Sequence, residues 1–84
     1  LRRLKDSEYA AAYLSACLED EEETFLVALR DVAEAHGGIR KMAEKTRLNR
    51  EHLFRMLSKS GNPSLHSLRQ LVGAVGLKLT VQPV

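Results

Sequence analysis

Aromatic residues and cysteine are scarce in this chain of 84 residues. It has no tryptophan, two tyrosines, two phenylalanines and a single cysteine, Cys17. One cysteine cannot form an internal disulfide, which fits a reducing cytoplasm, and we expect Cys17 to be a small packing residue rather than a nucleophile. No apolar run approaches the roughly eighteen residues of a membrane span. We therefore expect a cytoplasmic protein with no membrane partner.

The chain also lacks the residue patterns of catalytic and metal sites. Its three histidines, His36, His52 and His66, are scattered and do not have the spacing of metal ligands. We find no glycine-rich nucleotide loop, and no nucleophile has an identifiable base. The sequence therefore predicts a protein without enzyme activity, without a cofactor and without a metal.

The length is that of one domain, residues 1–84, with room for a single modest core. Hydrophobic residues make up 44% of the chain and charged residues 29%, an ordinary composition for a globular protein. A core of this size gains from association with a second copy. The chain begins at Leu1 rather than at a methionine, so the sequence does not define the natural N-terminus.

Charge is strongly segregated along the chain although the net charge is only +2. Residues 1–36 hold four bases against nine acids, a net of −5, whereas residues 37–59 hold seven bases against two acids, a net of +5. Residues 60–84 add two bases and no acid. A basic surface facing phosphates and backed by an acidic surface would have this distribution. The alternative for either segment is a solvated helix face.

Residues 38–58 have the pattern of two short helices joined by a tight turn. Asn49 is placed to cap the second helix, and Leu48 before it is expected to fold inward. An alanine at the helix crossing lets the two backbones approach. Apolar or small residues recur at helical spacing in both helices: Ile39, Met42, Ala43 and Thr46 in the first, and Leu53, Met56 and Leu57 in the second.

Three further helices are expected around this unit, which makes the chain all-α. A loose basic arm, residues 1–5, is followed by two acidic helices over residues 6–20 and about 21–36. After the two-helix unit comes a last helix over residues 64–75, capped by Ser64. The inward-facing residues are expected as follows: Tyr9, Ala12, Tyr13 and Ala16 in the first helix, Phe25, Leu26, Leu29, Val32 and Ala33 in the second, and Leu65, Leu68, Leu71, Val72 and Val75 in the last.

The segment 77–82 alternates apolar and polar residues, which predicts one short C-terminal strand. A lone strand leaves its backbone unpaired, so it needs a partner strand. The partner is either a second copy of this chain or the sheet of another protein. We expect a homodimer in which Leu77, Leu79 and Val81 contribute to the interface.

The second helix of residues 38–58 presents a polar, cationic face suited to the major groove of duplex DNA. Arg50 and Arg55 are expected to contact base edges or phosphates, and Glu51 to accept from a cytosine or hold an arginine. Phosphate contacts are expected from Asn49, Arg40, Lys41, Lys45 and Arg47. Phe54 lies on the same face, and His52 is either a phosphate contact or a partly exposed residue without a role. A dimer of such units would bind an inverted repeat with half-sites roughly 34 Å apart.

Several phrases together resemble the lambda-repressor-like helix-turn-helix group, and within it the HigA-type antitoxins of the addiction-module antidote family. They are the upstream EYAAAYLSACLED, FLVALRDVAEAHGG, the core MAEKTRLNREHLFRML, the loop GNPSLHSL and the closing GLKLTVQPV. The resemblance implies a five-helix lambda-repressor-like domain with the short strand at its end. One position departs from the pattern: Arg47 stands where the turn usually holds glycine. Either Arg47 adopts a positive φ, which costs on the order of 1 kcal/mol, or the turn is built differently.

The resemblance also implies a function and two partners. Such proteins are antitoxins of type II toxin–antitoxin modules; they neutralise a RelE/HigB-like toxin that cleaves messenger RNA, and they repress their own operon. Because such toxins are basic, the acidic helices from Glu8 to Glu34 are a candidate docking surface. One alternative is a stand-alone prophage-type regulator without a toxin. A second is a protein-interaction module that has lost DNA binding.

Overall fold

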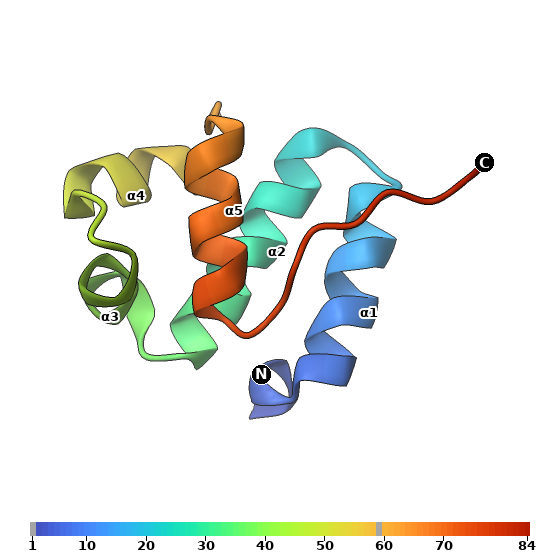
Figure 1. Cartoon of the computed structure of the whole chain (residues 1–84), viewed down its shortest axis with the longest axis horizontal. Coiled ribbons are helices and arrows are strands. Elements are labelled where there is room, and N and C mark those ends of the chain that lie inside the picture. The colour runs from blue at the N-terminus through green and yellow to red at the C-terminus, as the bar shows by residue number, and fades with distance from the viewer. Residues whose placement is uncertain (1, 59) are drawn as a thin grey trace.

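Five α-helices and one short 3-10 helix make up the regular structure of the computed structural model, which describes residues 2–58 and 60–84 (Figure 1). The order is η1 (Arg2–Lys5), α1 (Ser7–Leu18), α2 (Glu22–Ala35), α3 (Gly38–Thr46), α4 (Arg50–Met56) and α5 (Leu65–Ala74). The all-α prediction is confirmed. None of the described helices combines the length and the apolar character that crossing a membrane requires.

The helix starts follow from their capping residues. Asp6 Oδ1 accepts hydrogen bonds from the amide groups of Glu8 at 3.0 Å and Tyr9 at 3.5 Å, so α1 begins at Ser7. Ser64 Oγ accepts from the amide of Ser67 at 3.1 Å and starts α5. Each cap satisfies amide groups that have no partner inside the helix. The caps predicted at Asp6 and Ser64 are confirmed.

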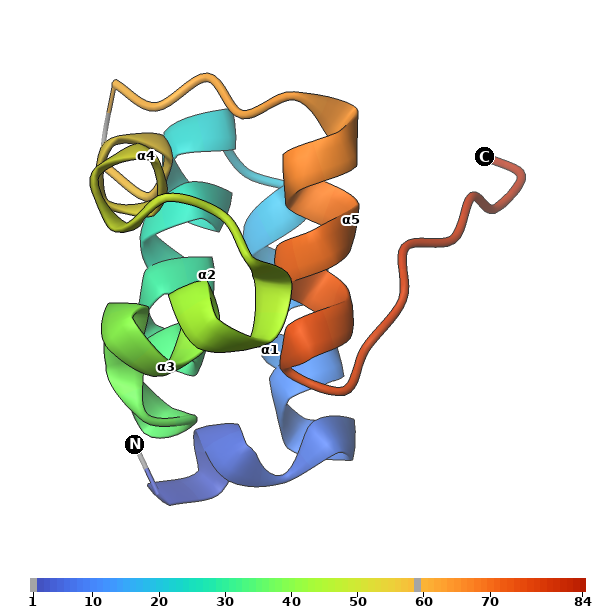
Figure 2. The same cartoon turned by 60° about the vertical axis from the view of Figure 1, so that its left-hand side comes forward.

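Helix α2 connects the two halves of the fold. It packs against α1 and η1 on one side and against α3 on the other, and α3 in turn contacts α4 and α5. Figure 2 shows α3 crossing in front of α2, with α4 and α5 on either side. The largest fully buried side chains come from α2 to α5 and the residues that follow these helices: Leu29, Val32, Met42, Leu53, Leu57, Leu71 and Val75.

The prediction for the buried face of α1 is wrong. Ala10 and Leu14 are the buried residues of this helix, whereas Tyr9 is 42% exposed and Ala12 and Ala16 also face outward. Tyr13 is half-buried. The reason is that α1 is apolar on nearly all sides, so two stripes at helical spacing compete and packing against α2 decides between them.

Two other expectations need correction. The predicted loose arm instead forms η1, and the side chain of Leu4 is buried with 4% exposure, because an apolar residue beside the α1–α2 contact is stabilised by burial. Leu1 lies outside the described residues. Leu65, expected in the core, is 66% exposed because it occupies the first position of α5, where the helix projects beyond its neighbours.

The C-terminal segment is not a strand in this structure. Residues 77–84 have neither helical nor strand hydrogen bonding, and the chain runs past α1 and ends away from the body (Figures 1 and 2). Gly76, with φ of +82°, ends the preceding turn, and Leu77 packs partly against the core. Val81 is 99% exposed. A strand forms only when its backbone groups bond to a neighbouring strand. None of the described residues offers such a strand, so the predicted strand does not form here.

Candidate nucleic-acid interface

Thr46 holds the turn between α3 and α4 in place. Its Oγ1 donates to the carbonyl of Met42 at 2.7 Å and accepts from the amide of Leu48 at 3.2 Å, and the side chain is buried. Arg47 between them has φ of +63° and ψ of +16°, the left-handed conformation, and its amide closes α3 on the Ala43 carbonyl at 2.8 Å. The turn is therefore built with a strained arginine rather than with a different geometry.

Asn49 starts α4 as expected. Its Oδ1 accepts from the amides of Glu51 at 2.8 Å and His52 at 3.2 Å, and Leu48 packs partly against the core. A cap of this kind is worth about 1 kcal/mol, a large share for a helix of two turns. Because Leu53 and Met56 are buried on the inner side, the orientation of α4 is fixed by its contact with α3.

The outer side of α4 carries the exposed polar residues. Arg50, Glu51 and Arg55 are all exposed, and the ring of Phe54 is 59% exposed. Arg50, Glu51 and Phe54 line an open hollow together with Ile39 of α3 and Asn49. Arg55 lies beside the loop that leads to α5. The structure thus brings the two guanidinium groups, a carboxylate and an aromatic ring to the surface of one short helix.

Arg30 of α2 joins this surface and was missed by the sequence analysis. Its guanidinium carbon lies 5.7 Å from the centre of the Phe54 ring, a cation–π geometry. Position along the chain assigned Arg30 to the acidic segment 1–36. Helical spacing in α2 offers a usable signal, because Arg30 falls on the same side of the helix as the exposed Glu23, Val27 and Glu34.

His52 points elsewhere. Its ring Nε2 lies 3.3 Å from Ser67 Oγ, and Ser64 Oγ donates to the same hydroxyl at 3.1 Å. The ring is half-buried between α4 and the start of α5. These contacts place His52 among the residues that hold α4 against α5.

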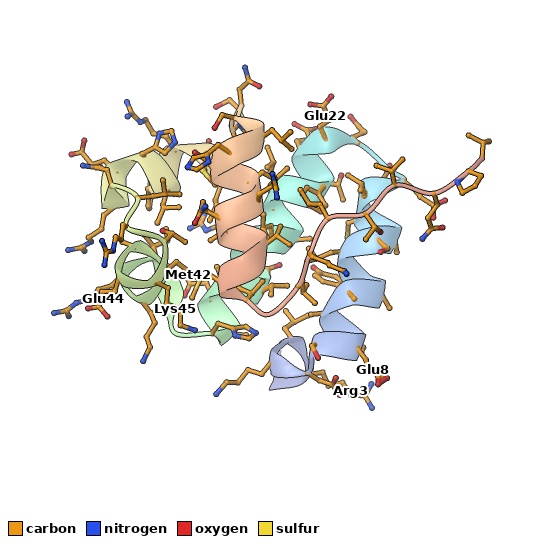
Figure 3. The ribbon with its side chains drawn as sticks, in the orientation of Figure 1. Arg3, Glu8, Glu22, Met42, Glu44 and Lys45 are labelled. Carbon is orange, nitrogen blue, oxygen red and sulfur yellow. The ribbon has the colours of Figure 1, made fainter. Side chains whose placement is uncertain are left out.

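The cations of α3 are divided between two surfaces. Arg40, Lys41 and Glu44 are exposed, whereas Lys45 Nζ donates to the Ala74 carbonyl at 3.4 Å, at the C-terminal end of α5. Figure 3 shows Glu44 directed outward and Lys45 lying toward α5, with Met42 inside. A cation at a helix C-terminus is favourable for the helix dipole. Lys45 therefore links α3 to α5.

Across the described residues, no three His, Cys, Asp or Glu side chains gather where they could hold a metal ion.

The chain matches, over residues 1–83, a family described as "Probable addiction module antidote protein". The chain belongs to the addiction-module antidote family. It is also 34% identical over 80 residues to an uncharacterised protein of Haemophilus influenzae, an alignment that covers 94% of this chain and 81% of that protein. No solved structure gives a significant match.

Membership in the antidote family assigns the chain to the antitoxin side of a toxin–antitoxin module and implies a toxin as partner. The antidote part of the resemblance stated from the sequence is thereby confirmed. Proteins of such a family are in general not enzymes.

Proposed function

We propose that this antidote protein is a sequence-specific DNA-binding repressor that neutralises a RelE/HigB-like mRNA-cleaving toxin and represses its own operon. The main support for this proposal is the exposed cationic face of α4. Thr46, Leu48 and Asn49 hold this helix at a fixed angle to α3. In this proposal α3, the turn at residues 47–49 and α4 form a lambda-repressor-like helix-turn-helix with α4 in the major groove.

The residues of this face have separate roles in the proposal. Arg50 and Arg55 contact base edges or phosphates, Glu51 accepts from a cytosine amino group or orients an arginine, and Asn49 contacts a phosphate. Exposed cations beside α4 bind phosphates and orient the domain without reading sequence: Arg40, Lys41, Arg47 and Arg30. The ring of Phe54 holds the guanidinium of Arg30 beside the major groove of the bound DNA. Lys45, which is exposed, is a further phosphate contact in this proposal and also links α3 to α5, while His52 holds α4 against α5.

A homodimer would align two such faces on an inverted repeat with half-sites roughly 34 Å apart. The proposed contact is the C-terminal segment, in which Leu79 is 38% exposed and Val81 is 99% exposed. Pairing of residues 77–82 with the same segment of a second copy would satisfy their backbone groups and bury these side chains.

The DNA-binding part is tested by titrating the protein against a duplex carrying the DNA upstream of its own gene and against a random duplex, over a range of salt concentrations. We expect binding of the upstream duplex at least a thousandfold tighter than the random one, with a steep decrease in affinity as salt increases. Equal binding of both duplexes would favour non-specific association and contradict the repressor proposal.

The antitoxin part is tested by co-expressing the chain with the product of the small reading frame adjacent to its gene. We expect the two proteins to purify together and the adjacent product to be harmless to cells only when this chain is present. Separate purification at micromolar concentration, with unchanged DNA binding, would instead favour a stand-alone regulator.

A further inference from the structure

A groove lies between α1 and α2 that the DNA-binding proposal does not use. It has a volume of about 380 Å³ and is open to solvent. The side chain of Val27 is 38% exposed there, and Cys17 is half-buried. The lining comes from the last two turns of α1 and the first two turns of α2: Tyr13, Cys17, Glu23, Thr24, Val27 and Ala28.

One end of the groove is held by a contact between the two helices. The Tyr13 hydroxyl donates to Asp31 Oδ2 at 3.3 Å. Burial, and then the charge of Asp31, raise the pKa of Tyr13 above its ordinary value of 10.0, so the phenol stays a neutral donor at physiological pH. The ring of Tyr13 is thereby fixed as a wall of the groove.

Acidic residues border one end of this groove. Glu23 lines it, and four further exposed acids precede Glu23 in the connection and first turn of α2. Arg30 is the one base in α1 and α2, and its guanidinium is turned to the Phe54 ring of α4. The five carboxylates of residues 19–23 outnumber this single cation, so the potential at that end of the groove attracts a positively charged surface.

The groove lies between α1 and α2, whereas the proposed DNA-binding face is centred on α4; Arg30, one turn after Val27, is the point where the two surfaces approach each other. Helix α1 packs on α2 and η1, while α4 packs on α3 at the other side of the fold. In Figure 3, Glu22 marks the acidic end of α2, well separated from Glu44 and Lys45 on α3. A partner seated on the groove leaves the outer side of α4 accessible.

We propose that this groove is the docking site for the basic toxin, which inserts an apolar side chain against Val27 and Tyr13 and places Lys or Arg residues against Glu23 and the acids that precede it. This inference rests on the proposed antitoxin function and specifies its surface. Val27 and the ring of Tyr13 supply the desolvated centre of the interface. The carboxylates of Glu23 and the acids that precede it attract the basic partner and orient it. Because the DNA face stays free, the complex binds the operator with the toxin attached.

Cys17 provides a direct probe, because it is the single thiol of the chain and lines the groove. The full chain, alone and in complex with the product of the adjacent reading frame, is treated with N-ethylmaleimide under native conditions and analysed by mass spectrometry. We expect alkylation of Cys17 to slow at least tenfold in the complex. Conversely, a chain alkylated in advance should bind the partner at least tenfold more weakly.

Two substitutions test the same site without the thiol. Val27→Lys and Glu23→Lys each place a cation where a basic partner must dock, on exposed helical positions that tolerate lysine. Each should weaken partner binding at least tenfold, measured by calorimetry, and neither should weaken operator binding. Glu44→Lys, the same charge reversal on exposed α3, is the matched control and should leave the partner affinity within twofold.

The outcomes separate this inference from the function on which it rests. If the wild-type chain forms no complex with the adjacent product, the antitoxin proposal fails. If the complex forms but Cys17 reacts at its free rate and Val27→Lys binds normally, the antitoxin proposal stands and the groove assignment is overturned. If Val27→Lys instead abolishes self-association of the chain and spares the toxin, the groove is occupied by a second copy and the assignment is likewise overturned.

Discussion

The guanidinium of Arg30 stacks over the ring of Phe54, 5.7 Å from its centre, and so connects the middle of α2 to the outer side of α4. Both residues are exposed, so the pair stabilises the fold by only about 0.5–1 kcal/mol. Its larger consequence is electrostatic. A cation from the acidic half of the sequence is added to the proposed DNA-binding face.

Replacing Arg30 should therefore weaken DNA binding without changing base preference. We expect Arg30→Gln to reduce operator affinity several-fold and to lower the slope of log affinity against log salt by about 1, because one phosphate contact is lost. Arg3→Gln is the matched control: Arg3 also lies over an aromatic ring, 5.5 Å from the centre of Tyr9, but at the start of α1. Equal salt slopes for wild type and Arg30→Gln would show that Arg30 does not contact DNA.

Replacing Arg47 should have opposite effects on the stability of the fold and on its affinity for DNA. Its φ of +63° favours glycine, so Arg47→Gly should raise the free energy of unfolding by about 0.5–1 kcal/mol in urea denaturation. The same variant should bind all DNA sequences more weakly, because the exposed guanidinium is lost. Arg47→Ala separates the two effects, since it removes the cation and retains the strain. A loss of stability in Arg47→Gly would contradict the strain argument.

Gly61 should be intolerant of a side chain. A Cβ atom at this position would overlap the carbonyl oxygen of Met56, the last residue of α4. We expect Gly61→Ala to lower the free energy of unfolding by about 1–3 kcal/mol, because the loop after α4 must move. Gly73→Ala is the control: a Cβ there meets no atom within 4 Å, and alanine inside α5 should stabilise by about 0.5–1 kcal/mol. Equal stabilities for the two variants would contradict the close approach at Gly61.

The Tyr13 hydroxyl should make stability sensitive to alkaline pH. Its pKa is raised in the folded chain by burial and by Asp31, so the neutral phenol favours the folded state. That contribution is fully present below pH 10.0, the ordinary pKa, and is lost as pH rises through the higher folded value. Urea unfolding of wild type and Tyr13→Phe from pH 8 to 11 should show a steeper loss for wild type. Parallel curves would mean that Tyr13 does not titrate differently on folding.

Local signals in the sequence were sufficient for the helices and the turn. Asp6, Asn49 and Ser64 cap helices by side-chain geometry that involves only the next two or three residues, and Leu53 and Met56 follow simple spacing. Such features can be predicted because they do not depend on the rest of the fold.

Sequence patterns were insufficient where the tertiary structure decides. In α1 either of two apolar stripes fits the spacing, and contact with α2 selects Ala10 and Leu14. Lys45 is exposed as expected, but its bond to the Ala74 carbonyl and the contact of His52 with Ser67 join residues far apart in the sequence and could not be predicted from local spacing. Arg30 was assigned by chain position to the acidic region, and only folding brings it to Phe54.

Arg50 and Arg55 of α4 are proposed to read DNA sequence, and operator binding by three single variants decides whether they do. We expect Arg50→Ala and Arg55→Ala each to lose about 1–3 kcal/mol of operator affinity and to discriminate less among base substitutions. Lys41→Ala should weaken binding to all duplexes alike and reduce the salt dependence. An Arg50→Ala protein that binds its operator with wild-type affinity and selectivity would contradict the account.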